Sequence, residues 1–190
     1  MHMNLFWLGP FFWPGYGSTT LPAVSSVYLW TVESHHDGYP DGYFLYLAGE
    51  TNDARRRFGS DEHTKSLRLG LWTIFDMEAM QRCERKEIWH GSQWTGGIEP
   101  SPDEKKMIEA AGQRMMADLR LFIAEMPDER RLRQRIEAAI MLGLYKTPKP
   151  LCDLPDTGMY LRPRRPDEGA IAVTNVCSSR IYGLPETMSV

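Results

Sequence analysis

The stretch Tyr46-Leu47-Ala48-Gly49-Glu50-Thr51, with Arg55-Arg56-Arg57 close behind it, carries the clearest structural signal in this sequence. Residues 43–48 have the aromatic and apolar composition of a strand, and Gly49 permits a tight exit from that strand. The arginines that follow are then placed on the first turns of a helix. We therefore predict a strand, a Gly-x-Thr turn and a basic helix in succession.

Residues 26–33 form an earlier run of branched and aromatic side chains, which predicts a buried strand. The polar stretch 34–42 separates the two runs, so we expect them to pair as antiparallel neighbours. Either Thr51 or Asn52 fits the N-cap of the short basic helix, which we place at residues 53–58.

The remaining elements follow from composition and helical spacing. Ser101-Pro102 and the acidic residues after it mark the start of a helix over residues 103–126. A second helix is predicted over residues 128–144 from the spacing of its apolar side chains. The other expected elements are strands, at residues 71–75, 87–89, 170–176 and 180–182, with a helix as the alternative for residues 77–87.

A chain of 190 residues is long enough for one domain with its own core. The order of elements predicts an α/β (α+β) domain, in which a small, mostly antiparallel sheet is flanked by helices. Apolar residues make up 42% and charged residues 25%, which argues against both a disordered chain and a membrane protein. We divide the domain into an irregular aromatic N-terminal arm that docks onto the core, the core, a helical part and a C-terminal β extension, at residues 1–25, 26–100, 101–150 and 151–190.

Cysteine content and charge bear on the cellular compartment and on the binding of nucleic acid. Cys83, Cys152 and Cys177 are odd in number and far apart, which predicts free thiols in a reducing compartment, the cytoplasm by default. The net charge of −3 is unlike the basic excess of many nucleic-acid-binding domains. The arginines nevertheless gather in patches, which set the local field near a phosphate, at residues 55–57, 130–135 and 162–165.

The order and spacing of these motifs resemble those of the GIY-YIG nuclease family. Val27-Tyr28-Leu29 stands in the place of the family's first strand motif, and Arg57 lies eight residues beyond Gly49, which is the family's spacing. Glu137 lies on the second predicted helix, as the family's glutamate does. The resemblance covers residues 26–75 and, more loosely, residues 130–153.

The resemblance implies a metal-dependent endonuclease that hydrolyses phosphodiester bonds of DNA with Mg²⁺ or Mn²⁺. Tyr28 would act as the base for the attacking water, and Glu137 would be the metal ligand. Arg57 would bind the scissile phosphate, because a guanidinium offers parallel donors to two oxygens. Further candidates implied by the resemblance are Tyr46 as the second tyrosine, His63 as a catalytic assistant, and Arg56 and Lys65 as substrate-binding residues.

The sequence departs from the family at two positions. Leu47 stands where the second tyrosine belongs, and Tyr46 is one residue off, so on a regular strand it faces the opposite side. Only a β-bulge would restore it. Asp153 stands where the family often has an asparagine. These departures favour a second hypothesis, a catalytically impaired module that binds nucleic acid or a partner protein.

Structural readings of the same residues remain open. Tyr28 could be a packing residue of a buried strand, and Glu137 an exposed helix residue paired with Arg133 one turn earlier. A third hypothesis is an interaction protein, in which the aromatic arm and the methionine-bearing helix 103–126 form a dimer interface. A homodimer would also suit double-strand cleavage by a nuclease with one site.

Overall fold

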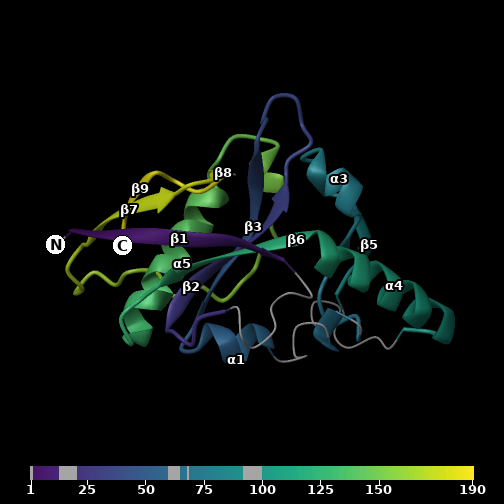
Figure 1. Ribbon diagram of the computed structural model, residues 1–190, viewed down its shortest axis with the longest axis horizontal. Coiled ribbons are helices and arrows are strands. Elements are labelled where there is room, and N and C mark those ends of the chain that lie inside the picture. Colours follow the sequence, from purple (N-terminus) through teal and green to yellow (C-terminus); the bar gives the residue numbers. More distant parts are fainter. Residues whose placement is uncertain (1, 13–20, 60–64, 68, 92–99) are drawn as a thin grey trace.

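The computed structural model describes residues 2–12, 21–59, 65–67, 69–91 and 100–190 (Figure 1). It is a mixed α/β fold in which a curled, half-barrel sheet of seven strands forms the centre. In spatial order the strands are β8 (Arg180–Tyr182), β3 (Gly42–Thr51), β2 (Ser26–Glu33), β6 (Leu119–Glu125), β1 (His2–Phe12), β7 (Ala172–Cys177) and β9 (Thr187–Ser189). Neighbours are antiparallel except for the pairs β1–β7 and β3–β8, which are parallel.

Helices cover both faces of this sheet (Figure 1). α5 (Arg130–Leu144) lies against β3 and β2 on one face. The elements on the other face are α1 (Ala54–Gly59), α3 (Met77–Gln81), α4 (Pro102–Asp118) and the short hairpin of β4 (Ile74–Phe75) and β5 (Glu87–Trp89). No helix in the described part of the chain has the length and apolar character needed to cross a membrane.

The core consists of two apolar clusters, one on each face of the sheet. β2 lies between β3 and β6 and is buried from Ser26 to Val32. Its side chains alternate between the clusters, as they do on any strand. Tyr28 and Trp30 lie in the cluster under α1 and α4, whereas Val27 and Leu29 lie in the cluster under α5. The aromatic side chains of β2, Tyr28 and Trp30, therefore face the side of the sheet that carries the basic helix α1.

A β-bulge interrupts the pairing of β3 with β2. Trp30 is opposite Leu47 and Thr31 is opposite Leu45, so Tyr46 is an extra residue in β3. Leu45 lies in the cluster under α5, but Tyr46 lies in the cluster on the other face and Leu47 also packs against that cluster. The bulge thus places Tyr46 on the same side of the sheet as Tyr28, which is the rearrangement that the sequence required.

The N-terminal segment is a strand rather than the irregular arm predicted from its glycine and proline content. Residues 2–12 form β1, which lies between β6 and β7 with Leu5 and Trp7 buried. Gly9 marks a break in register on the β6 side: its φ is +149°, and a Cβ there would approach the Leu121 carbonyl oxygen to 2.7 Å. The glycine therefore bends the strand at a bulge and does not end it.

The helix predicted over residues 103–126 is too long. Its start is confirmed, because Ser101 and Glu104 form a capping box at the beginning of α4. The helix ends at Asp118, and residues 119–125 form β6 between β2 and β1. A strand buried on both faces has a continuous apolar run, which cannot be distinguished from a buried helix by its spacing. The sheet is consequently larger than the small one expected.

The other predicted elements are largely confirmed. The antiparallel pair of β2 and β3 is present, as are α5, the β4–β5 hairpin, β7 and β8, and the helical alternative within residues 77–87 is realised by α3. The N-cap of α1 is one position later than predicted, because the Asp53 carboxylate accepts a hydrogen bond from the Arg56 amide at 2.9 Å. β9 has no counterpart among the predicted strands.

Replacement of Phe122 tests the central position of β6. Phe122 is fully buried, and its ring lies edge-on to that of Tyr43 with 5.3 Å between centroids. We expect Phe122→Ala to lower the free energy of unfolding by about 3–5 kcal/mol, measured by urea denaturation. Phe6→Ala in β1 is the matched control: Phe6 is 61% exposed, so its loss should cost less than about 1 kcal/mol. Equal effects of the two changes would contradict the burial of β6.

Candidate functional site

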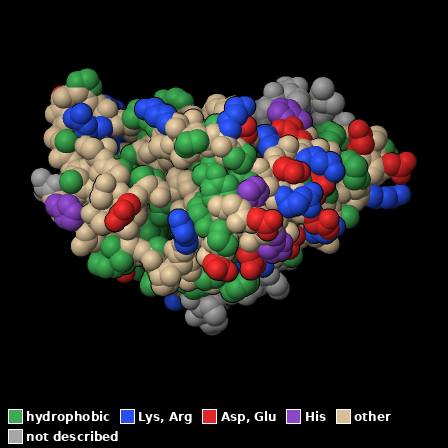
Figure 2. Space-filling model, turned by 90° about the horizontal axis from the view of Figure 1, so that it is seen from above, with side chains coloured by type: hydrophobic (Ala, Val, Ile, Leu, Met, Phe, Trp, Pro, Cys, Tyr) green, Lys and Arg blue, Asp and Glu red, His purple; other side chains and the backbone are tan. Residues whose placement is uncertain are grey.

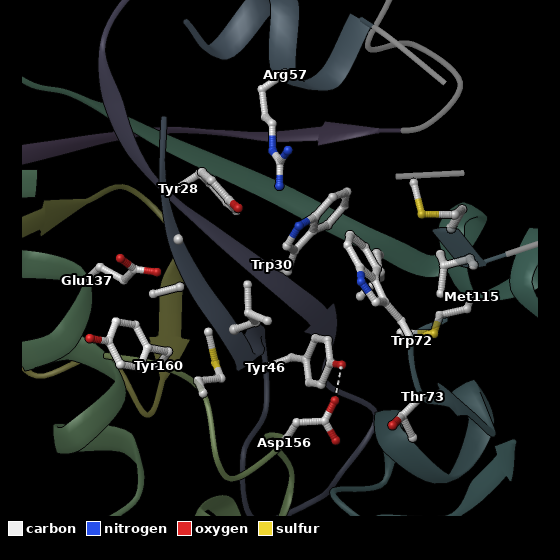
Figure 3. Close-up of a pocket in the computed structure, with 17 residues that line it drawn as sticks. Tyr28, Trp30, Tyr46, Arg57, Trp72, Thr73, Met115, Glu137, Asp156 and Tyr160 are labelled. Carbon is white, nitrogen blue, oxygen red and sulfur yellow. Dashed lines mark hydrogen bonds between the residues drawn. The ribbon is translucent and has the colours of Figure 1, made fainter. Parts of the chain in front are cut away.

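A cavity of about 280 Å³ opens beside the second half of β3 (Figure 3). β8 pairs only with Gly42–Phe44, so the rest of this edge of β3 has no strand partner among the described residues. We call this space the tyrosine cavity. The residues that matter for its chemistry come from six elements or segments: Tyr28, Tyr46, Arg57, Trp72, Glu137 and Asp156.

The structure brings together four of the residues singled out in the sequence. Tyr28, Tyr46, Arg57 and Glu137 all line the tyrosine cavity, although they come from β2, β3, α1 and α5. Lys65 is exposed and lines neither this cavity nor the groove described below. His63 lies outside the described residues.

Tyr28 is held between a glycine and an aromatic ring. A Cβ at Gly49 would overlap the ring carbons and hydroxyl of Tyr28, so the close approach of these neighbouring strands requires glycine. The Tyr28 ring also lies edge-on to Phe58 of α1, at 4.8 Å between centroids. Burial raises the pKa of Tyr28, an effect that Arg57 opposes and the carboxylate of Glu137 reinforces. The hydroxyl is therefore protonated at neutral pH.

Glu137 extends from α5 into the cavity (Figure 3). Among the described residues, none forms an ion pair or hydrogen bond with its carboxylate. Burial raises its pKa to about 7, with a further contribution from the charge of Glu50. The ion pair between Glu137 and Arg133 that the sequence left open does not form. Arg133 donates hydrogen bonds to Glu50 at 3.1 Å and to Asp128 at 3.1 Å instead. Glu137 is therefore a half-buried carboxyl group that is only partly ionised near neutral pH.

Glu137 could contribute one ligand to a divalent cation. The described residues contain no group of three or more His, Cys, Asp or Glu side chains that could hold a metal ion. Glu137 offers one hard oxygen ligand of the kind that Mg²⁺ and Mn²⁺ accept, and its charge has no other partner in the described structure. The remaining ligands would be water and the oxygens of a bound phosphate.

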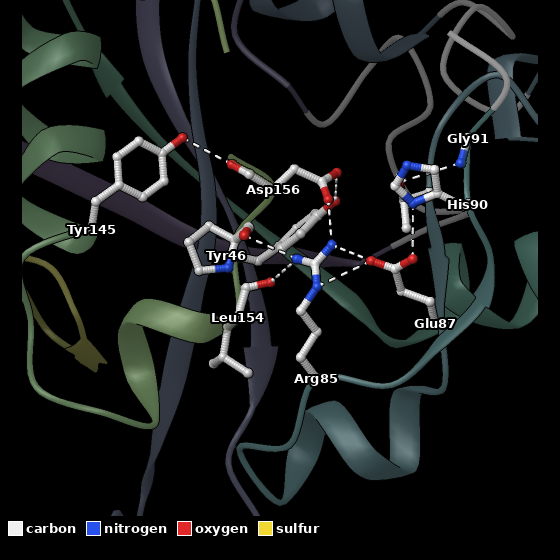
Figure 4. Close-up of polar contacts among 10 residues, drawn as sticks. Tyr46, Arg85, Glu87, His90, Gly91, Tyr145, Leu154 and Asp156 are labelled. Carbon is white, nitrogen blue, oxygen red and sulfur yellow. Dashed lines mark hydrogen bonds and ion pairs between the residues drawn. The ribbon is translucent and has the colours of Figure 1, made fainter. Parts of the chain in front are cut away.

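Tyr46 belongs to a polar network with Asp156 and Arg85 (Figure 4). Its hydroxyl donates to Asp156 at 3.3 Å, and Arg85 donates to the other oxygen of Asp156 at 2.7 Å. Arg85 also bonds Glu87 and two backbone carbonyls, and lies over the Phe75 ring. Burial and the Asp156 charge hold the pKa of Tyr46 well above its usual range. Tyr46 is consequently a fixed, neutral hydrogen-bonding group.

Asp156 is the site residue that the sequence did not reveal. Asp153, the residue that aligns with the family's asparagine, lies on the short 3-10 helix η1 (Leu151–Asp153) and pairs with Lys149 at 3.2 Å, away from the cavity. Asp156 enters the cavity three residues later. Its position is determined by Arg85, which is distant in sequence, so no local motif could have identified it.

A second hollow, of about 360 Å³, adjoins the cavity at Arg57, which lines both. We call it the arginine groove; it is lined by Glu50, Thr51, Asn52, Arg56, Arg57, Arg130 and Arg133. The predicted basic patch at residues 130–135 is only partly available, since Arg135 is buried and donates to the carbonyls of Gly169 and Val190. Of these arginines, Arg130 and Arg133 line the groove and pair with Glu50 there; Arg130 is exposed and Arg133 is buried.

The contact between Gly49 and Tyr28 can be tested by adding one methyl group. Gly49→Ala should displace the Tyr28 ring and lower the free energy of unfolding by about 1–3 kcal/mol, because a well-packed strand pair cannot absorb the added volume. Gly169→Ala is the matched control, since nothing lies within 4 Å of a Cβ at that position. Urea denaturation of both variants measures the effect, and similar stability of the two would show that Tyr28 does not lie against Gly49.

The raised pKa of Glu137 has a consequence for stability in the absence of divalent metal. The carboxyl is protonated in both states below about pH 4.5, but at higher pH the unfolded chain releases its proton first. Glu137 therefore destabilises the folded protein increasingly as the pH rises from 4.5 to 7. Glu137→Gln should raise the free energy of unfolding by about 1–3 kcal/mol at pH 8 and by little at pH 4.5. Urea denaturation across this pH range, with the exposed Glu125→Gln as control, measures the difference; a constant difference contradicts the prediction.

Comparison with known proteins provides no relative from which a function could be transferred. No family model matches the chain, and neither a curated protein nor a solved structure does. The function must therefore be argued from the tyrosine cavity and the arginine groove themselves.

Proposed function

We propose that this protein is a metal-dependent endonuclease that hydrolyses DNA phosphodiester bonds at the tyrosine cavity by a GIY-YIG-like mechanism. One observation carries the proposal: Tyr28, Arg57 and Glu137 come from three separate elements and line one cavity. The β-bulge adds Tyr46 to the same cavity. A base for water, a phosphate-binding cation and a metal ligand are the groups that phosphodiester hydrolysis needs.

In the proposed reaction, the oxygen of a water molecule forms a bond to phosphorus while the bond from phosphorus to the leaving sugar oxygen breaks. The attacking water gives up a proton, and the leaving oxygen gains one. Arg57 would bind the non-bridging phosphate oxygens and stabilise the charge that develops on them. Its guanidinium remains charged at any working pH.

Glu137 would hold Mg²⁺ or Mn²⁺; an ion of this kind, when bound, would supply positive charge next to the phosphate and assist protonation of the leaving oxygen. Neutralising the charge of Glu137 also acts on Tyr28. The Glu137 carboxylate raises the pKa of Tyr28 and Arg57 lowers it, so compensation of Glu137 leaves the lowering influence of Arg57 unopposed by that charge. The phenolate of Tyr28 would then form more readily, and it would take the proton of the attacking water after its own hydroxyl proton has been released to solvent.

A second candidate function is a module that keeps this fold and binds nucleic acid or a protein without cutting. Two observations favour it: both cavity tyrosines have raised pKa values, and the described residues offer no group of three metal ligands. Phosphate binding at Arg57 would remain, while water activation would not.

Cleavage of supercoiled plasmid in Mg²⁺ or Mn²⁺ separates the two candidates. We expect nicking by the wild type and a loss of about 100-fold or more in Arg57→Ala and in Glu137→Gln, because each removes a group that acts on the transition state. Circular dichroism of each variant confirms that it is folded.

Arg82→Ala and Glu125→Gln are the matched controls, since these exposed residues lie outside both the cavity and the groove. Both should cut at the wild-type rate. An inactive wild type, or folded site variants that cut as fast as the controls, would rule out an active nuclease for the DNA tested. The binding module would then become the leading function, and RNA and structured DNA would be the next substrates.

A further inference from the structure

One wall of the tyrosine cavity is apolar and aromatic, and so it is not suited to bind phosphate. Trp30 and Trp72 lie next to each other on the side away from Glu137, with Met115 behind them (Figure 3). These side chains provide flat aromatic faces and a polarisable sulfur, but little capacity to bind an anion. In proteins that bind unpaired nucleotides, aromatic faces of this kind stack on the bases.

The size of the cavity limits what this wall can contact. Its volume of about 280 Å³ lies near the lower end of the roughly 300–1,000 Å³ of small-molecule sites. A single nucleobase with part of its sugar fits that space, and a base of a duplex can enter a protein pocket only after it has left the base stack. A base that enters must therefore be unpaired.

Arg57 connects this apolar space to the arginine groove, because its side chain lines both. The groove also presents Arg56 and Arg130, whose side chains are exposed. A nucleotide with its phosphate at Arg57 could place its base against the tryptophans, and the neighbouring phosphate would lie in the groove. Alternation of apolar cavity and basic groove corresponds to the alternation of base and phosphate along one strand.

The charge distribution favours one strand over a duplex. Acidic and basic side chains are interspersed on the face in Figure 2, and the chain has a net charge of −3. In the arginine groove itself, Glu50 pairs with Arg130 at 3.4 Å and with Arg133 at 3.1 Å, so the groove is not a continuous basic surface for the two backbones of a duplex. A few phosphate contacts and one buried base need no such surface.

We propose that the tyrosine cavity binds one unpaired nucleobase of a single-stranded or locally opened polynucleotide, next to the phosphate held by Arg57. This inference rests on the proposed function for the identity of the substrate as a polynucleotide, and it specifies the substrate class. A base within a duplex would have to be flipped out, at a cost of a few kcal/mol. Unpaired strands are accordingly the preferred substrates.

Binding without cleavage tests this proposal separately from the nuclease. The wild-type protein in EDTA is titrated into labelled single-stranded oligonucleotides, either with normal bases or with every base replaced by an abasic residue of equal charge. At a fixed salt concentration, fluorescence anisotropy should give roughly 5- to 100-fold tighter binding for the strand with bases. DNA and RNA strands form separate arms, and a duplex of the same length should bind more weakly than the single strand.

Trp72 provides the site-specific control. Trp72→Leu should remove most of the preference for bases, whereas Trp72→Phe retains an aromatic face and should keep most of it. Phe6→Leu, a change at an exposed aromatic residue of β1 outside the cavity, should leave the preference intact. Tyr160→Ala gives an independent check, because Tyr160 lines the cavity yet is 86% exposed and its loss does not endanger folding; it should weaken the preference.

Equal affinity for normal and abasic strands would overturn the proposal, as would a preference that survives in folded Trp72→Leu or tight binding of the duplex. None of these results depends on metal or on cleavage. An active nuclease with no base preference would refute the base site alone. Base-dependent binding by a protein that never cuts would refute the endonuclease and retain the base site.

Discussion

The candidate site depends on the extra residue that β3 carries at Tyr46. If β3 were regular and Leu47 and Ala48 kept their present facing, Tyr46 would point into the cluster under α5, on the opposite face from Tyr28. The bulge changes the facing of the strand within one residue, so that Leu45 and Ala48 still fill the core under α5 while Tyr46 and Leu47 face the cavity. One local irregularity therefore serves both the core and the site, which is common for bulges near functional residues.

Past the bulge, the side chain of Tyr28 in β2 packs closely against the backbone of β3. Beyond it, Gly49 is opposite Tyr28, and only a residue without a side chain leaves room for the tyrosine ring. β8 ends its pairing at Phe44, so the edge of β3 past the bulge is open to α5 and to the segment that carries Asp156. Groups from the two faces of the sheet can meet there, which is how Glu137 of α5 comes to share a cavity with Tyr28.

The sequence predicted the parts of this arrangement that depend on local patterns. Tyr28, Arg57 and Glu137 could be placed on one strand and two helices from composition, spacing and capping. The need for a bulge at Tyr46 could be stated, but its presence could not be decided, because it depends on the pairing with β2. β1 and β6 were misjudged for the same reason: each is a strand only because of partners distant in the chain.

Burial was the other property that the sequence could not supply. Glu137 on a helix reads as a surface residue that pairs with Arg133, yet Arg133 is directed to Glu50, which leaves Glu137 in the cavity without that partner.

In the proposed function, the lack of that partner affects the order in which substrate and cation bind. A phosphate held by Arg57 brings oxygens close to Glu137, so substrate and cation would each strengthen the binding of the other, by the same factor in both directions. Without substrate the carboxyl has a pKa of about 7, and a proton competes with the cation for it. In the proposed reaction, the single carboxylate would thus favour a metal site that is assembled only when the substrate phosphate is present.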